Sequence, residues 1–436
     1  MNISLQSLFK EISVFFIIGL LLIYRYVDIG LEQNQVILFS LYYFFAVLTF
    51  VFSRLRFNSP INPISIFVPF LFLLSYSFLQ LSENQSVYSF HTLVIINVSI
   101  IAYLIFASLE YSYQPLKFTK IDNNLRVKFL RFFILMAFVT LVIECFMFGY
   151  IPIFNITGLD VYNDSNTKLV PFLHYFIVIN AFIPTWSYIF LKEKLISKQE
   201  FKIVLFLSIF ILLNYLSKQM YLLFGLSFFV SYSFYNELKL KNLFKAISII
   251  ILVFLFLGYL RLDSETTFSA AELYRAYAGI KNENVSVIES FFVLYSSVRF
   301  TVLNEMVNFS DEIHYLGSGI YTFRPFTSLF LLEKTGIIQR IPELDSENRV
   351  GTFLADPYLD FGFFGVFFLN AFYGFSALRY YRQYKDKYPE AIVKFSIIVF
   401  CLLMGMFVNY FNSMLIWLGI LFNKFIIGGL VKKSKI

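Results

Sequence analysis

The sequence has few charged residues and few of the residue types that build metal or disulfide frameworks. Charged residues make up 14% of the chain, whereas an average soluble domain carries about 25%. The two cysteines, Cys145 and Cys401, lie far apart in apolar stretches, so we expect neither a disulfide nor a metal framework. The three histidines, His91, His174 and His314, lack ligand spacing, so no metal site is expected. No Walker, Rossmann, nucleophile-elbow or zinc motif occurs, and no cofactor is predicted.

Apolar residues take the place of the missing charges. They form 58% of the 436 residues, and Phe (59) and Tyr (30) are especially abundant. A soluble protein of this composition would aggregate, so the bilayer is the expected solvent. The net charge of +7 is no sign of nucleic-acid binding, because the basic residues lie in short loops beside apolar stretches. The first stretch, residues 12–24, has no small-residue cleavage site, and we interpret it as a retained helix rather than a signal peptide.

The apolar stretches predict an all-α polytopic integral membrane protein. Since a spanning helix needs about 20 mostly apolar residues, we expect about 12 transmembrane helices, in a range of about 10 to 14. The predicted spans are residues 9–27, 36–53, 63–82, 91–109, 129–149, 170–191, 201–216, 219–236, 244–260, 357–378, 391–410 and 412–430. The seventh and eighth are short and share a tight turn at Ser217-Lys218, so they are alternatively a hairpin that does not fully cross.

The basic residues between the spans predict the orientation. The tails and every second loop carry 23 Lys and Arg, whereas the short loops of the other side carry three. Because cytoplasmic loops are enriched in Lys and Arg, both termini are predicted to be cytoplasmic. Three segments result: transmembrane helices 1–9 in residues 1–260, one large external loop in 261–356, and helices 10–12 with a basic cytoplasmic tail in 357–436.

The external loop is rich in arginine, while the cytoplasmic side favours lysine. Arginine is preferred where a planar fork must hold phosphate or carboxylate oxygens. The loop therefore indicates an anionic ligand at the membrane surface, and lipid-linked pyrophosphate fits. Alternatively, these residues pair with acidic residues of the loop, as surface ions commonly do. The basic residues of the loop are Arg261, Arg275, Lys281, Arg299, Arg324, Lys334, Arg340 and Arg349.

Residues 285–308 predict an amphipathic helix in or near the membrane interface. Arg299 falls in the middle of its apolar stripe, which comprises Ile288, Phe292, Tyr295, Val302 and Met306. The polar residues Ser290, Ser297, Asn304 and Asn308 fall on the opposite face. Since an unpaired buried charge is costly, Arg299 either extends to the surface or stacks on aromatic rings, or it faces a pocket with an anionic occupant.

Carboxylates enter an apolar helix at the end of the loop. Asp356 and Asp360 are spaced i,i+4 around Pro357 and Tyr358. Asp356 is interpreted either as the N-cap of the helix or as a catalytic group. Asp360 lies deeper, where a carboxylate is costly, and is a candidate general base or partner of a loop arginine.

Two further polar residues lie at the predicted outer ends of spans. Glu144 ends the fifth span, and Lys218 lies at the tip of the short hairpin. Both could face the same external site.

Residues Gly351 to Gly365 read Gly-Thr-Phe-Leu-Ala-Asp-Pro-Tyr-Leu-Asp-Phe-Gly-Phe-Phe-Gly. This stretch resembles the Wzy-type oligosaccharide repeat-unit polymerases of O-antigen and capsule. Its Asp-Phe-Gly-x-x-Gly core begins at Asp360. The plan of about a dozen spans with one dominant external loop is also similar, and the family's outer-turn Ser-Arg or Ser-Lys resembles Ser217-Lys218. An Arg-x10-Gly pattern described for some members occurs once, from Arg340 to Gly351.

The resemblance implies glycosyl transfer on the outer face of the cytoplasmic (inner) membrane. The donor and acceptor would be undecaprenyl-pyrophosphate-linked oligosaccharides, and a chain-length regulator and a flippase would be partners beside the membrane lipids. For such a reaction, the residues singled out above form the candidate site, with Asp360 and Asp356 as the catalytic groups. The substrate-binding residues would be Arg299, Arg324, Arg340, Arg349, Arg261, Lys218 and Tyr358.

Other functions stay open at this point. An O-antigen ligase would move the same donor to the lipid A core. A lipid-linked oligosaccharide flippase would have short loops throughout, and a secondary transporter would have paired polar residues and broken helices in its middle.

Overall fold

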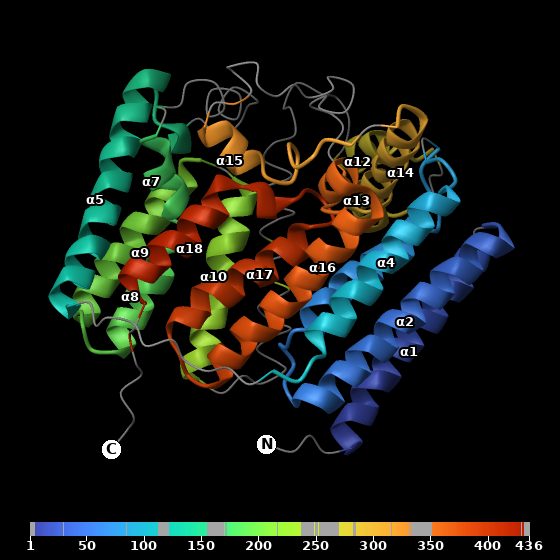
Figure 1. The fold of residues 1–436 in the computed structure, drawn as a ribbon, viewed down its shortest axis with the longest axis horizontal. Helices are drawn as coiled ribbons and strands as arrows, with labels where there is room; N and C mark the ends of the chain where they lie inside the picture. Colours follow the sequence, from blue (N-terminus) through green and yellow to red (C-terminus); the bar gives the residue numbers. More distant parts are fainter. Residues whose placement is uncertain are drawn as a thin grey trace. The chain divides into compact units, whose positions relative to one another are not determined.

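Helices make up the regular secondary structure of the described residues in this computed structural model (Figure 1). The structure describes residues 5–111, 122–154, 170–236, 270–330 and 351–430, apart from short gaps at 29, 84, 171, 216, 282–284, 315 and 429. It also describes the single residues 248, 252 and 332. The helices are α1 (Leu5–Asp28), α2 (Gln33–Phe57), α3 (Val68–Ser77), α4 (Phe90–Ala107), α5 (Asn123–Phe148), α7 (His174–Ile179), α8 (Ile183–Lys192), α9 (Lys198–Leu213), α10 (Lys218–Tyr235), α12 (Ala270–Ala278), α13 (Val287–Tyr295), α14 (Ser297–Glu312), α15 (Arg324–Leu329), α16 (Ala355–Lys385), α17 (Glu390–Met404) and α18 (Met414–Ile426). Single 3-10 turns occur at Ser65–Phe67, Pro152–Phe154 and Tyr410–Asn412.

Four of the described helices are long and apolar enough to cross a membrane. They are α2, α4, α5 and α16. The chain is therefore a membrane protein with several candidate spans, and the all-α prediction is confirmed for the described residues. These four helices are fewer than the twelve predicted spans. The predicted span 244–260 lies outside the described residues, apart from Ser248 and Leu252.

Contacts divide the chain into two compact units. Unit 1 comprises Met1–Tyr111, Phe268–Leu378 and Cys401–Ser413. Unit 2 comprises Ser112–Thr267, Arg379–Phe400 and Met414–Ile436. This grouping cuts across the three segments predicted along the chain, because the first and last of them each contribute to both units.

Aromatic side chains hold the beginning of unit 1 together. Tyr26 of α1 meets Phe39 of α2 edge to face at 5.3 Å, and Tyr76 of α3 meets both rings in the same way. In a membrane, lipid tails are as apolar as the side chains, so helix association depends on such packing rather than on expulsion of water. The abundance of Phe and Tyr therefore supplies interior contacts as well as surface for lipid.

A buried arginine closes one helix end in unit 2. Arg126 of α5 donates to the backbone oxygens of Ile426 at 2.8 Å and Gly428 at 2.6 Å. The last carbonyl groups of a helix have no partner within the helix. Arg126 satisfies one such group at Ile426, the last residue of α18, and a second carbonyl group just beyond the helix at Gly428. Trp186 Nε1 donates to Asn423 Oδ1 of α18 at 3.1 Å. Arg126, one of the basic residues that predicted the orientation, thus also stabilises the packing of two helices.

The predicted helix 285–308 is two helices. α13 begins at Val287 after a capping box formed by Ser286 and Glu289, and the break falls at Ser296, directly before α14 begins at Ser297. Residues of both predicted faces are buried, Val302 and Met306 on the apolar side and Ser290, Ser297 and Asn304 on the polar side. Asn304 shows how a polar residue is buried here, since its side chain accepts from Ser89 N and Thr92 Oγ1, both at 2.8 Å, and donates to Ser86 Oγ. Polar side chains can be buried in a helix contact when the neighbouring segment supplies hydrogen-bond partners for them.

Candidate functional site

The carboxylates predicted at the end of the external loop lie at the beginning of α16. This helix is interrupted at Gly362, whose φ of 59° and ψ of −146° leave helical geometry. Such a backbone conformation is almost restricted to glycine. The break separates a short leading helix, which carries Asp356, Tyr358 and Asp360, from the long apolar part that follows. The Asp-Phe-Gly sequence therefore corresponds to a helix that ends and restarts beside two carboxylates.

Asp360 is buried and fastens a turn in residues 317–322. Its side chain is 1% exposed, and it accepts the backbone N–H groups of Tyr321 at 3.2 Å and Thr322 at 2.5 Å. The backbone oxygen of Asp360 accepts from Ser318 N at 3.2 Å. A side chain at Gly317 would collide with the Asp360 carboxylate, which explains a glycine there. In this geometry Asp360 holds residues 317–322 against α16.

Asp356 is joined to the same turn by two asparagines. The structure starts α16 at Ala355, so Asp356 lies within the first turn, and its interpretation as the N-cap is wrong. Its Oδ2 accepts from Asn409 Nδ2 at 2.9 Å and from Asn412 Nδ2 at 2.5 Å. Asn412 Nδ2 also donates to the backbone oxygen of Tyr321 at 2.7 Å. One amide group therefore links Asp356 to the segment that Asp360 holds.

Tyr358 connects α16 to two other helices of unit 1. Its hydroxyl donates to Asp311 Oδ1 on α14 at 2.5 Å. The second oxygen of Asp311 lies 2.5 Å from Nδ1 of His91, the second residue of α4. The ring of Phe363 on α16 meets the imidazole edge to face at 5.9 Å. Tyrosine, carboxylate and imidazole thus form a chain of hydrogen bonds across three helices.

The predicted substrate-binding residues have different placements. Arg324 is exposed and begins α15, directly after the turn that Asp360 holds. Arg299 is half-buried in α14. Lys218 begins α10, but its side chain is outside the described part of the chain, as are Arg261, Arg340 and Arg349. Asp356 and Asp360 are thus linked through Asn412 and the segment that leads to Arg324. Tyr358 belongs to a different set of contacts, with Asp311 and His91.

Glu144 belongs to a separate polar cluster in unit 2. It is fully buried in α5, and its carboxylate accepts from the Tyr215 hydroxyl and from Val170 N at 3.3 Å. Nδ1 of His174 lies 3.2 Å from the same carboxylate. A buried carboxylate must be paired or hydrogen-bonded, and these three groups provide that. The cluster ties α5 to the start of α7 and to the end of α9.

An apolar groove of about 450 Å³ lies beside this cluster in unit 2. The residues that line it belong to α5, to the turn that follows α5, and to the end of α9. They are Phe138, Leu141, Val142, Cys145, Phe146, Gly149, Tyr150, Ile151, Phe210 and Asn214. On a spanning helix, a groove of this chemistry can take a hydrocarbon chain.

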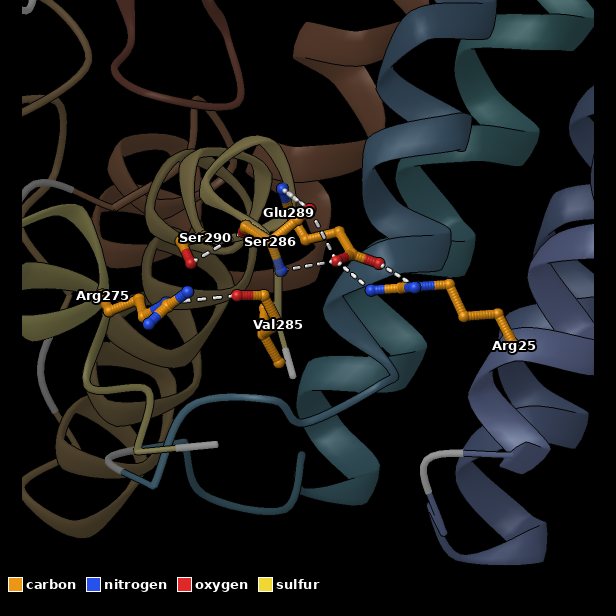
Figure 2. Close-up of polar contacts among 6 residues, drawn as sticks. All are labelled: Arg25, Arg275, Val285, Ser286, Glu289 and Ser290. Atoms are coloured by element: carbon orange, nitrogen blue, oxygen red, sulfur yellow. Dashed lines mark hydrogen bonds and ion pairs between the residues drawn. The ribbon is translucent and has the colours of Figure 1, made fainter. Parts of the chain in front are cut away.

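A bidentate ion pair joins α13 to α1 (Figure 2). Arg25 donates through Nε and Nη2 to the two carboxylate oxygens of Glu289, each at 2.7 Å. The same carboxylate accepts from Ser286 N and Oγ. Burial raises the pKa of Glu289, but the hydrogen bonds from Arg25 and Ser286 outweigh it, so the pKa lies below the ordinary 4.5. Nearby, Arg275 Nε donates to the backbone oxygen of Val285 at 3.2 Å (Figure 2).

Sequence reasoning missed His91, Asp311, Asn409 and Asn412. Their partners are distant in the chain, with 220 positions between His91 and Asp311. A usable signal was nevertheless present. The predicted topology places all four on the outer side, at span ends, in the turn between the last two spans or in the external loop. Among the described residues, no group of three or more His, Cys, Asp or Glu side chains gathers as a metal site would require.

Comparisons of the chain with protein families, with curated proteins and with solved structures found no match.

Proposed function

We propose that this chain is a membrane glycosyltransferase that polymerises undecaprenyl-pyrophosphate-linked oligosaccharide repeat units into O-antigen or capsular polysaccharide. The reaction would take place on the outer face of the cytoplasmic membrane. The observation that carries the proposal is that two sets of polar contacts meet the start of α16, one at Asp356 and Asp360 and one that runs from Tyr358 through Asp311 to His91. Polymerisation needs a group that accepts a proton from a sugar hydroxyl, and this cluster supplies several candidates.

Positive charge beside the cluster supports a pyrophosphate leaving group. When the bond to the anomeric carbon breaks, negative charge develops on the pyrophosphate, and fixed cations stabilise it. Arg324 is exposed at the start of α15, and the Asp360 carboxylate holds the turn that precedes it. Arginine can bind two phosphate oxygens at once, which fits this role better than lysine does.

Lipid-linked substrates also require apolar surface. A polyprenyl tail would lie among the apolar helices, and the groove beside α5 is one surface of suitable chemistry. Donor and acceptor would both be lipid-linked oligosaccharides, and a chain-length regulator and a flippase would act with this chain in the same membrane. No cofactor is part of the proposal.

Surface glycan from a strain that lacks the gene, compared with the complemented strain on a gel, tests the proposal. We expect the ladder to disappear while a single repeat unit stays attached. Loss of attached units with long lipid-linked polymer would instead identify an O-antigen ligase. Loss of attached glycan with unpolymerised units kept inside the cell would identify a flippase, and an unchanged ladder would exclude all three functions.

A further inference from the structure

The acidic groups at the start of α16 differ in what their oxygens already bind. Both oxygens of Asp360 accept backbone N–H groups, and its side chain is 1% exposed. The carboxylate is therefore buried and already engaged by the backbone, so a sugar hydroxyl has little access to it. Asp360 is also needed to hold the turn at residues 317–322. Its position therefore fits a structural anchor better than a general base.

His91 is exposed, and a contact with Asp311 orients its ring. Its side chain is 55% exposed, and that of Asp311 is 34% exposed. Asp311 meets the Nδ1 side of the ring at 2.5 Å, so Nε2 is the nitrogen on the far side. Tyr358 donates to the other oxygen of Asp311 and limits how that carboxylate can turn. A base oriented by a carboxylate, which a third group positions, is the arrangement used to activate hydroxyl groups.

We infer that His91 is the general base of the proposed glycosyl transfer, with Asp311 and Tyr358 as its positioning residues. The inference rests on the proposed function and assigns its base to a residue outside the Asp-Phe-Gly sequence. Asp311 holds the proton of the neutral ring on Nδ1, which leaves Nε2 free to accept a proton. When the ring becomes charged, the same carboxylate stabilises it.

The hydroxyl oxygen of the acceptor sugar forms the new bond to the anomeric carbon of the donor, and its proton passes to Nε2 of His91. The bond between the anomeric carbon and the pyrophosphate oxygen breaks, and its electron pair leaves with the undecaprenyl pyrophosphate. The imidazolium then returns its proton to the released pyrophosphate or to water.

The test measures glycan extension on lipid-linked repeat units by membranes that contain the wild-type chain or a variant. We expect His91→Ala to lower the turnover about 100- to 10,000-fold, the range that general base catalysis contributes. The KM for the repeat unit and the amount of protein in the membrane should change little. Added imidazole should restore part of the rate in His91→Ala, because it can enter the space of the lost ring. Asp311→Asn should give a smaller loss of turnover.

His314→Ala is the matched control. His314 is another exposed histidine, in the turn that follows α14, and its replacement should leave the rate unchanged. A wild-type rate in His91→Ala would overturn the inference. So would a His91→Gln variant with the wild-type rate beside a His91→Ala variant that imidazole does not restore, because the ring would then serve packing alone. If the wild-type chain itself extends no glycan, the proposed function fails rather than the choice of base.

Discussion

The carboxylate of Asp360 accepts the backbone N–H of Thr322 at 2.5 Å, across 38 positions of the chain. This bond, with the one from Tyr321, joins the leading part of α16 to the turn that precedes α15. A residue of the Asp-Phe-Gly sequence thus determines where an exposed arginine, Arg324, leaves the turn. The conformation of the turn at residues 317–322 therefore depends on a side chain buried in the helix.

Asp360→Asn tests this anchor. An amide that replaces the carboxylate turns one acceptor into a donor, so one backbone N–H faces another donor. The loss should be about 1–3 kcal/mol of unfolding free energy, the cost of leaving a buried group unsatisfied. Thermal unfolding in detergent measures it, and glycan chain length should shorten in parallel. Glu312→Gln, an exposed carboxylate on α14, is the control. Unchanged unfolding in Asp360→Asn would contradict the anchoring role.

Gly362→Ala tests the interruption of α16. The φ of 59° with ψ of −146° is open to glycine and strained for other residues, at about 1–3 kcal/mol. The variant should therefore unfold at a lower temperature, or straighten the helix and move Asp356 and Asp360 away from their partners. Unfolding and chain length are again the measurements. Phe364→Ala, two residues on and exposed, should leave both nearly unchanged. If Gly362→Ala and Phe364→Ala had the same unfolding temperature and the same glycan chain length, the interruption of α16 would contribute to neither.

Arg324→Ala tests the pyrophosphate contact. Because the side chain is exposed, its removal should leave thermal unfolding within about 0.5 kcal/mol of the wild type. Glycan chains should nevertheless become shorter, and Arg324→Lys should restore them only in part, since lysine cannot form the bidentate contact. Lys128→Ala, an exposed charge on the predicted cytoplasmic side, is the control. Full-length glycan in Arg324→Ala would remove this residue from the proposed site.

The ion pair of Arg25 and Glu289 predicts a pH dependence. The pKa of Glu289 in the folded chain lies below 4.5, so the pair stabilises the fold above pH 4.5 and the stabilisation is lost as the pH falls below that value. A double-mutant cycle of Arg25→Ala and Glu289→Ala should give a coupling of roughly 1 kcal/mol between pH 6 and 8, because the arginine is partly exposed.

The same cycle at Arg131 and Glu200 is the matched control for this pair. Those side chains are more exposed, and their coupling should be smaller. A coupling at Arg25 and Glu289 that disappears already near pH 7 would contradict the lowered pKa. A coupling near zero at every pH would show that the contact seen in Figure 2 adds no stability.

The sequence by itself determined the class of this protein. Runs of apolar residues are a local property, and they predicted an all-helical membrane protein whose described helices include four of spanning length. The carboxylates that begin α16 were also found from the sequence, because Asp356 and Asp360 interrupt an apolar run. Local periodicity was less reliable at residues 285–308, where the break at Ser296 and the burial of Asn304 depend on partners in α4 and the segment before it.

Only the tertiary structure decided which polar side chains are partners. Asp360 binds a turn that ends 38 positions before it, Asp356 binds Asn409 and Asn412, and Asp311 lies between Tyr358 and His91. Residue spacing cannot encode these choices, because any polar group at the same end of the bundle would satisfy the same need for a hydrogen bond. Which of them meet depends on how the helices pack, and packing is set by the apolar side chains along their whole length.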